Sequence, residues 1–443
     1  MAVTAGWEQF FKERHPVAAV TGVDPLDSLG RALPRSGDTP RGSEHLRLGY
    51  ACIWEPVAEH TWSGSASGLR QGLETAAETV DLGVRFPALT RTALKAIHTH
   101  YRSGRLTTSW SYSSLTAAYI AHSVETSLRR NRSKRPLDAV LTIDTIATVP
   151  EPFFAYYDSS WDALMSGAAS LRQFAKMRLL TPSEVLRQRD QQLVRFEHAT
   201  GIITMSHWLA RSLVEQSGVP ADKIHVVPPG RPNRRAQPIG VTSSPSGNRA
   251  GAREAQRRRS ESGQRRRSLL FVGRLYEPHD FYRKGGDIVV DALRILRHEF
   301  DPQITLTMVG IDKWPISGDI PEGIHLRGVV PYSQVRELYE THDLFVMPSR
   351  MEPFGLVFTE ALCQGMPCVA RNACAMPEIV TPGVSGALVS SDDPSELANT
   401  IVSVLADDDL YERCRGRAAA LAEYFSWDRA ACEIADLINR QVR

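Results

Sequence analysis

The chain of 443 residues is predicted to fold into two doubly wound α/β domains, and three observations support this prediction. Short, continuous apolar runs recur along the chain, and such runs are typical of parallel strands that are covered on both faces. The segments between these runs have the apolar spacing of helices. A polar, arginine-rich segment interrupts the series once and leaves two alternating halves, each long enough for one domain.

The first half begins after a polar segment that is rich in Gly, Pro and Arg. Residues 1–43 are therefore interpreted as an N-terminal extension that is partly disordered. A strand is expected from Leu46 to Ile53, followed by a loop that contains Gly64-Ser65-Ala66-Ser67-Gly68 and a helix to about Val80. Further strands are expected at 139–143, 153–157, 201–204 and 224–227, and a capping box at Thr181-Pro182-Ser183-Glu184 opens a helix. Together they predict a domain over 44–230.

The interrupting segment covers 231–268 and has a composition unlike the rest of the chain. It contains eleven arginines and only two glutamates, in a chain whose net charge is +2. This composition cannot bury enough apolar surface to fold, so a disordered linker or insertion is predicted. The remainder of the chain is then net negative, and the overall charge is no sign of a basic surface.

The second half repeats the alternation and predicts a domain over 269–426. Strands are expected at 269–272, 304–309, 324–326, 344–347 and 367–370, and a helix with Ile288, Val289, Ala292, Leu293 and Leu296 on one face. A second capping box is expected at Asp393-Pro394-Ser395-Glu396. Two such Rossmann-like domains are expected to face each other across a cleft, with ligands at the carboxyl ends of the strands.

Composition excludes several classes of protein. No run approaches the ~20 apolar residues that span a bilayer, and no basic segment followed by an apolar core marks a signal peptide at the N-terminus. The cytoplasm is therefore the expected location. The six cysteines form no CxxC pair and have no zinc-type spacing to histidines. They are interpreted as reduced, mostly buried thiols, and no metal site is expected.

The most informative stretch runs from Arg350 to Leu362. It follows an apolar strand and opens a helix, with Gly355 where backbone amides at the helix N-terminus can bind an anion. Glu352 and Glu360 flank these amides, and carboxylates there can accept hydrogen bonds from sugar or ribose hydroxyls. The alternative is that both glutamates only stabilise the helix N-terminus through its dipole.

This stretch resembles the signature of the family 4 glycosyltransferases, which are retaining GT-B enzymes that use nucleotide sugars. The shared features are two glutamates separated by seven residues and a Phe-Gly pair just after the first. The resemblance implies that Glu352 contacts the donor sugar and that Glu360 contacts the ribose hydroxyls. It also implies that the amides of Phe354, Gly355 and Leu356 bind the donor.

Two basic residues upstream extend the resemblance. Arg274, in Phe271-Val272-Gly273-Arg274-Leu275, and Lys284, in Arg283-Lys284-Gly285-Gly286, resemble the residues that bind the donor diphosphate. Two fixed cations stabilise the negative charge that grows on a leaving diphosphate. A single arginine or lysine is otherwise most often a solvated surface charge.

Other segments match the family less closely. Met376-Pro377-Glu378-Ile379-Val380 resembles a Pro-Glu-Ile-Val element, but Cys374 and Ala375 stand where the family usually has glycines. The helix 427–443 resembles a segment that crosses back to the N-terminal domain. The loop after the first strand resembles the family's glycine-rich loop, so Gly64 and Ser65 are expected to bind the donor diphosphate.

One acidic residue in the first half is a candidate for catalysis. Asp158 follows the strand 153–157 and is expected to orient the acceptor hydroxyl, a role for which Asp144 at the end of another strand is an alternative. The alternative for each aspartate is that it caps a helix.

The resemblance implies a hexosyltransferase-like reaction in which the acceptor attacks the face that the nucleotide leaves, with no metal or other cofactor. Two alternatives stay open: another GT-B enzyme (a sugar-nucleotide epimerase or a phosphorylase), and a nucleic-acid-binding protein acting through the arginine-rich segment. The acceptor is a saccharide, a lipid or a small molecule, and no specific nucleic acid is expected. The basic run Arg129–Arg135 is either a contact for anionic lipid at a membrane surface or an exposed loop.

Overall fold

The computed structural model describes residues 46–102, 105–132, 135–144, 148–166, 180–231, 266–273 and 278–443. The predicted N-terminal extension, most of the arginine-rich segment and Arg274 lie outside the described residues. The described residues divide into two compact units. The first holds 46–231 together with 425–443, and the second holds 266–424.

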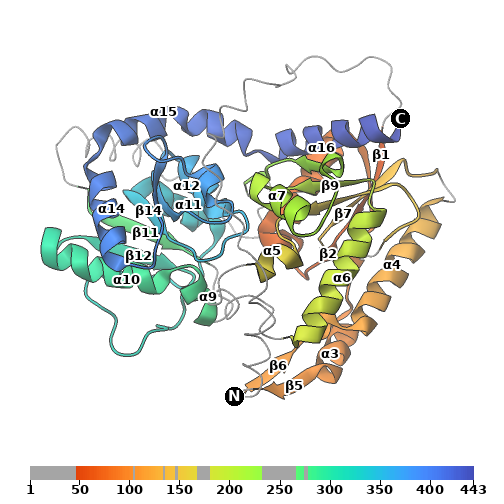
Figure 1. Ribbon diagram of the computed structural model, residues 1–443, viewed down its shortest axis with the longest axis horizontal. Coiled ribbons are helices and arrows are strands. Elements are labelled where there is room, and N and C mark those ends of the chain that lie inside the picture. Colours follow the sequence, from red (N-terminus) through yellow and green to blue (C-terminus); the bar gives the residue numbers. More distant parts are fainter. Residues whose placement is uncertain are drawn as a thin grey trace, which may run out of the picture. The chain divides into compact units, whose positions relative to one another are not determined.

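The first unit is built on a six-stranded parallel sheet with the order β10-β9-β8-β7-β1-β3 (Figure 1). Its strands are β1 (Arg47–Ala51), β3 (Glu78–Asp81), β7 (Ala139–Ile143), β8 (Phe153–Tyr157), β9 (Gly201–Thr204) and β10 (Ile224–Val226). Every residue of β1, β7, β8 and β9 is buried. This burial on both faces explains why these strands are continuous apolar runs in the sequence.

Seven helices belong to this unit among its described residues: α2 (Ser65–Ala76), α3 (Ala88–Ile97), α4 (Ser114–Arg132), α5 (Trp161–Met165), α6 (Pro182–His198), α7 (His207–Glu215) and α16 (Trp427–Val442). Its smaller elements are η2 (Ala58–Gly64), η3 (Trp110–Tyr112), η6 (Ala221–Lys223), the paired β2 (Ile53–Trp54) and β4 (Val84–Arg85), and the hairpin β5 (Thr99–Arg102) and β6 (Arg105–Thr108). The capping box of α6 is confirmed, because the Thr181 hydroxyl and the Glu184 carboxylate each bind the other residue's backbone N–H. The C-terminal helix α16 packs closely on α2, where a Cβ on Gly72 would stand 2.6 Å from the Trp427 carbonyl oxygen.

The second unit contains a six-stranded parallel sheet with the order β13-β12-β11-β14-β15-β16. Its strands are β11 (Ser268–Val272), β12 (Thr305–Val309), β13 (Ile324–Leu326), β14 (Leu344–Met347), β15 (Cys368–Arg371) and β16 (Gly386–Val389). Its helices are α9 (Pro278–Arg283), α10 (Gly286–Ile295) with the π-turn η7 (Leu296–Phe300), α11 (Tyr332–Thr341), α12 (Leu356–Leu362), α13 (Met376–Ile379), α14 (Pro394–Ala406) and α15 (Asp408–Tyr424). The prediction of doubly wound parallel sheets in two domains is confirmed.

Two edge strands depart from the sequence prediction. The helix expected to reach Val80 ends at Ala76, and Glu78–Asp81 forms β3, which pairs with β1. β16, at Gly386–Val389, was not predicted and pairs with β15. Both strands lie at an edge of their sheet and are partly exposed, so neither shows the apolar run of a central strand. In the part of the chain that the structure describes, no helix has both the length and the apolar character to cross a membrane.

Candidate functional site

The strand order of the second unit marks where a ligand can bind. Counted along the chain, its strands run 3-2-1-4-5-6 across the sheet, so the winding reverses between β11 and β14. In doubly wound sheets, ligands bind outside the carboxyl ends of the two strands at which the winding reverses. The loop after β14 carries Glu352, and the turn between α9 and α10 carries Lys284.

Lys284, which is buried, and Glu352, which is partly buried, form an ion pair at this edge. The Lys284 Nζ stands 2.9 Å from the Glu352 Oε2, and the Arg283 Nη1 stands 3.9 Å from the same oxygen. Burial raises the pKa of the Glu352 carboxyl, but the charges of Lys284 and Arg283 outweigh it and hold that pKa below its ordinary value. Glu352 is therefore an ionised carboxylate, and it can only accept hydrogen bonds.

Two glycines bring these segments together. Gly285 precedes α10 with a φ of +74°, and a Cβ there would lie 2.5 Å from the Pro348 carbonyl oxygen at the end of β14. Gly355 precedes α12 with a φ of +102°, and a Cβ there would lie 2.7 Å from the Phe358 ring. Only glycine combines the left-handed backbone with this close approach.

Helix α12 places the second glutamate. Phe354 is buried, Gly355 is the N-cap, and Leu356 is the first helical residue. Glu360, in the middle of α12, is buried and its Oε2 accepts a hydrogen bond of 3.1 Å from the Tyr339 hydroxyl of α11. Burial, reinforced by the Glu360 charge, raises the pKa of Tyr339, so its hydroxyl stays a proton donor.

The first unit brings the other predicted residues together. Trp62, Ser63 and Gly64 all have left-handed backbone, and Ser65 begins α2. The Trp62 Nε1 donates a hydrogen bond of 3.2 Å to the Asp158 Oδ2, which links the loop to the end of β8. Sequence reasoning missed Trp62, which no motif distinguished. Asp158 is not the cap of the following helix, because Ser160 caps α5.

Part of the second unit is similar to a known family. The model for "Glycosyl transferases group 1" matches residues 252–420. These residues are thus similar to the group 1 glycosyl transferases. The chain's resemblance to family 4 enzymes is thereby confirmed.

Curated relatives carry glycosyltransferase names, and solved structures share the fold. A "D-inositol 3-phosphate glycosyltransferase" of Xylanimonas cellulosilytica is 27% identical over 62% of this chain and 66% of its own length. A protein of the same name from Streptomyces coelicolor is 30% identical over 53% and 54%. The chain thus spans between half and two thirds of these relatives. A sucrose-phosphate synthase from Thermosynechococcus elongatus has a similar fold, with a TM-score of 0.59 at 18% identity over 89% of this chain and 98% of its own. Anabaena Alr3699/HepE in complex with UDP and glucose has a TM-score of 0.55 at 17% identity over 89% and 100%.

The departure from the family pattern at Cys374 keeps the backbone shape of glycine. Cys374 has a φ of +52°, in the left-handed region that other residues adopt at an energetic cost of about 1–2 kcal/mol. Burial raises the pKa of its thiol to about 11, although a hydrogen bond from the backbone of Glu352 acts in the opposite direction. The thiol is therefore neutral and packs beside the segment that carries Glu352.

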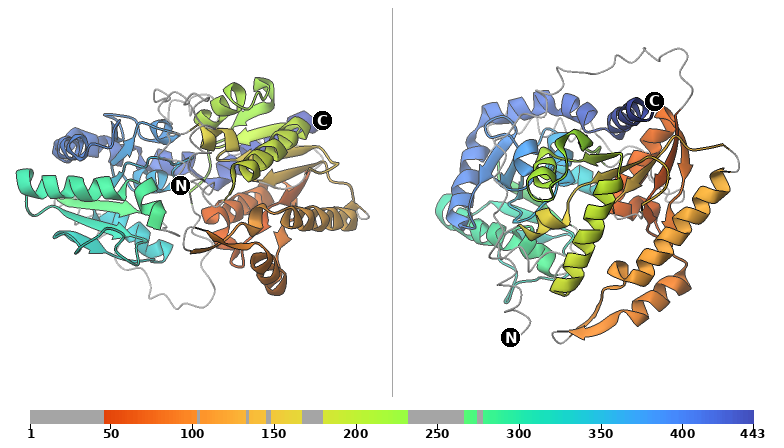
Figure 2. Two further views of the ribbon diagram at one scale, coloured as in Figure 1. Left: turned by 60° about the horizontal axis from the view of Figure 1, so that its bottom comes forward. Right: turned by 45° about the vertical axis from the view of Figure 1, so that its right-hand side comes forward.

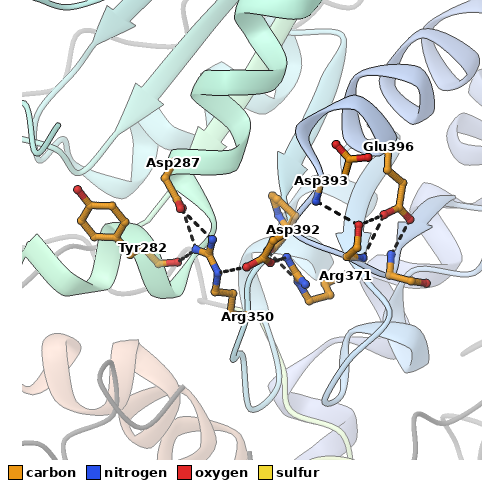
Figure 3. Close-up of polar contacts among 10 residues, drawn as sticks. Tyr282, Asp287, Arg350, Arg371, Asp392, Asp393 and Glu396 are labelled. Carbon is orange, nitrogen blue, oxygen red and sulfur yellow. Dashed lines mark hydrogen bonds and ion pairs between the residues drawn. The ribbon is translucent and has the colours of Figure 1, made fainter. Parts of the chain in front are cut away.

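A network of ion pairs around Arg350 holds the two charged segments in place (Figure 3). The guanidinium of Arg350 binds both Asp287 oxygens at 2.8 Å, and its Nε binds Asp392 at 2.8 Å. The guanidinium also donates to the Tyr282 carbonyl, while the Arg350 backbone N–H donates to the Arg283 carbonyl at 2.8 Å. Arg350 lies just before Glu352, and its contacts therefore link this segment to the residues just before Lys284.

The same figure shows that the second predicted capping box does not form. The Asp393 side chain caps α14 by accepting from the Ser395 N–H, as expected. Glu396 instead accepts hydrogen bonds from the backbone of Ser390 and Ser391 (Figure 3). Two backbone donors, with the Ser391 hydroxyl, satisfy this carboxylate better than the single N–H that a capping box supplies.

Replacing Arg350 with methionine is expected to lower the free energy of unfolding by about 2–4 kcal/mol, because it removes several charge-assisted hydrogen bonds and leaves Asp287 without its partner. Urea unfolding of the purified variants measures this loss. Arg294→Met is the matched control, since Arg294 pairs with Asp291 on the exposed face of the same helix, α10. The control is expected to lose less than about 1 kcal/mol. An equal loss in both variants would show that the network does not hold these segments.

Proposed function

We propose that this protein is a retaining glycosyltransferase that moves a sugar from a nucleotide-diphosphate sugar to an acceptor hydroxyl. The observation that carries the proposal is the largely buried Lys284–Glu352 pair at the point where the strand order reverses, within the residues that match the group 1 glycosyl transferases. A buried cation beside a carboxylate suits a ligand with a phosphate next to sugar hydroxyls.

Each predicted site residue of the second unit has a role in this proposal. Lys284 and Arg274 bind the diphosphate, together with the backbone amides from Phe354 to Leu356. A diphosphate attracts the Lys284 ammonium, so Glu352 is left to accept hydrogen bonds from the donor sugar. Glu360 accepts from the ribose hydroxyls. Gly64 and Ser65 are included among the donor-binding residues.

The bond between the anomeric carbon and the diphosphate oxygen breaks, and the acceptor oxygen bonds to the same face of that carbon. The acceptor proton passes to the leaving phosphate oxygen, so no separate base on the protein is required. Asp158 orients the acceptor hydroxyl. Lys284 and Arg274 stabilise the charge that develops on the leaving group, which is the role a divalent metal has in other transferases. We therefore propose a reaction that needs no metal or other cofactor.

The relatives' name suggests the first acceptor to test, D-inositol 3-phosphate. A saccharide, a lipid and another small molecule are the remaining classes, and no specific nucleic acid is included. We place the reaction in the cytoplasm because all six cysteines are free thiols, four of them buried.

A thermal unfolding panel of UDP-, GDP- and ADP-sugars tests the donor class. One nucleotide sugar is expected to raise the Tm by several degrees when it is present at about 100 times its Kd. Inorganic phosphate is the control and is expected to have a much smaller effect. If no nucleotide sugar changes the Tm, the donor assignment is wrong.

Proton NMR of the reaction separates the competing enzymes. A retaining transferase gives a product with the anomeric configuration of the donor, and it leaves the donor's ring stereochemistry unchanged when no acceptor is present. An epimerase would change the donor alone, and a phosphorylase would require inorganic phosphate. An inverted product would overturn the retaining mechanism.

A further inference from the structure

One stretch of the first unit has a highly unusual charge pattern. From Leu82 to Val124 the sequence contains no aspartate or glutamate, although the whole chain has 50. The same stretch contains five basic residues, Arg85, Arg91, Lys95, Arg102 and Arg105. A continuous segment with cations alone is a candidate contact for an anionic partner.

The centre of this stretch folds into helix α3 and the β5–β6 hairpin, which extend beyond the parallel sheet of their unit (Figures 1 and 2). The hairpin is fixed to the end of the helix. The Thr99 hydroxyl donates to the Lys95 carbonyl at 2.6 Å, and the Ser109 backbone N–H donates to the His98 carbonyl at 3.2 Å. Of the residues in α3, only Leu94 is buried. The helix and the hairpin therefore form one projecting element, and Leu94 is the residue of α3 that packs into the unit.

Large apolar side chains are exposed on this element. On α3, Leu89 is 86% exposed and Ile97 is 61% exposed, and both lie on one flank of the helix together with the exposed Ala93. On the hairpin, Tyr101 is 73% and Leu106 is 74% exposed. These two residues are direct partners across the antiparallel pair, so their side chains lie on the same face. Exposed apolar side chains gathered on one element indicate a binding surface.

We propose that α3 and the β5–β6 hairpin dock on the surface of an anionic lipid bilayer. Leu89, Ile97, Tyr101 and Leu106 enter the boundary between headgroups and acyl chains. Arg91 and Lys95 lie four residues apart on the opposite face of α3. In a helix lying in the plane of the interface, their long side chains reach the anionic headgroups. Neither of these two cations pairs with a carboxylate among the described residues.

The basic run at Arg129–Arg135 is a poorer lipid contact than the sequence suggested. Arg129 pairs with Glu125 at 2.7 Å, Arg132 with Glu151 at 2.7 Å, and Arg135 with Glu78 at 3.2 Å. Each of these three arginines already has a carboxylate beside it, which makes it less available to an anionic headgroup. The contact for anionic lipid is therefore assigned to α3 and the hairpin instead.

Charge and chemistry together favour lipid over other partners. A second copy of this surface would oppose cations to cations, which disfavours self-association. An acidic polymer would contact the cations but would leave the aliphatic side chains in water. Only a phase with anionic groups at its surface and apolar chains beneath matches both features.

Sedimentation of the full chain with vesicles tests this surface without any donor or acceptor, so its outcome is independent of the proposed transferase activity. We expect binding to vesicles of phosphatidylcholine with about one-third phosphatidylglycerol, weakening with salt, and little binding to phosphatidylcholine alone. Leu89→Glu, Leu106→Glu and Lys95→Glu are each expected to weaken binding about tenfold or more. Because these side chains are exposed, the Tm is expected to stay unchanged.

Two matched controls use exposed residues elsewhere in the same unit. Val194→Glu changes an apolar residue on α6 that is 49% exposed, and Arg129→Glu changes a cation in the basic run. Both are expected to bind anionic vesicles like the unchanged protein. Equal binding to neutral and anionic vesicles, or equal losses in variants and controls, would overturn the proposal. So would a dimer in gel filtration that Leu106→Glu dissociates, or heparin binding without vesicle binding.

Discussion

Replacing Lys284 with methionine is expected to lower the rate of sugar transfer by at least about a hundredfold, the usual effect of removing one group that stabilises charge in a transition state. Lys284 is buried and fixed against Glu352 at 2.9 Å, so its charge is already in place before the donor binds. A preorganised cation of this kind stabilises a leaving diphosphate without further rearrangement. Initial rates with the donor found by the thermal panel measure the effect.

The variant also leaves a partly buried carboxylate with a weaker partner. Among the described residues, Glu352 would retain only Arg283, at 3.9 Å. Breaking a fully buried ion pair from one side destabilises by about 3–5 kcal/mol, which sets the upper limit for this pair. The double variant Lys284→Met/Glu352→Gln removes both charges and is expected to recover most of that stability while transfer stays low. Lys313→Met, which changes an exposed lysine of the same unit, is the control. Transfer at the unchanged rate in folded Lys284→Met would refute the role given to this lysine.

The central strands could be predicted because a strand that is buried on both faces requires a continuous run of apolar residues. β11 and β14 are almost entirely buried, and both were predicted close to their observed bounds. β3 and β16 could not be found in this way. Each is an edge strand, and its pairing depends on a neighbour that is distant in the chain rather than on its own composition.

The geometry of the candidate site likewise depends on residues that are distant in the chain. Motif spacing marked Lys284 and Glu352 separately, but their direct ion pair depends on the left-handed turn at Gly285 and on how β11 and β14 lie in the sheet. Arg350 was visible only as the first residue of a motif. Its role in joining the two segments requires Asp287 and Asp392, which lie 63 and 42 positions away.

Replacing Glu360 with glutamine is expected to raise the KM for the donor about 10–100-fold and to change kcat much less. The ribose lies away from the breaking bond, so a hydrogen bond to it stabilises the bound ground state and the transition state equally. A hydrogen bond to a charged acceptor contributes about 1.5–3 kcal/mol. Initial rates over a range of donor concentrations separate KM from kcat.

Tyr339→Phe separates ribose binding from a structural role of the same carboxylate. The Tyr339 hydroxyl donates to the Glu360 Oε2 at 3.1 Å, and glutamine still offers a carbonyl oxygen to that donor. Glu360→Gln should therefore keep the contact between α11 and α12, whereas Tyr339→Phe removes it and leaves the carboxylate charged. If Glu360 binds ribose, Glu360→Gln is expected to raise the KM with little change in Tm. Tyr339→Phe is then expected to lower the Tm with a smaller change in KM. The reverse pattern would mean that Glu360 acts through packing of the two helices, and the ribose assignment would then be abandoned.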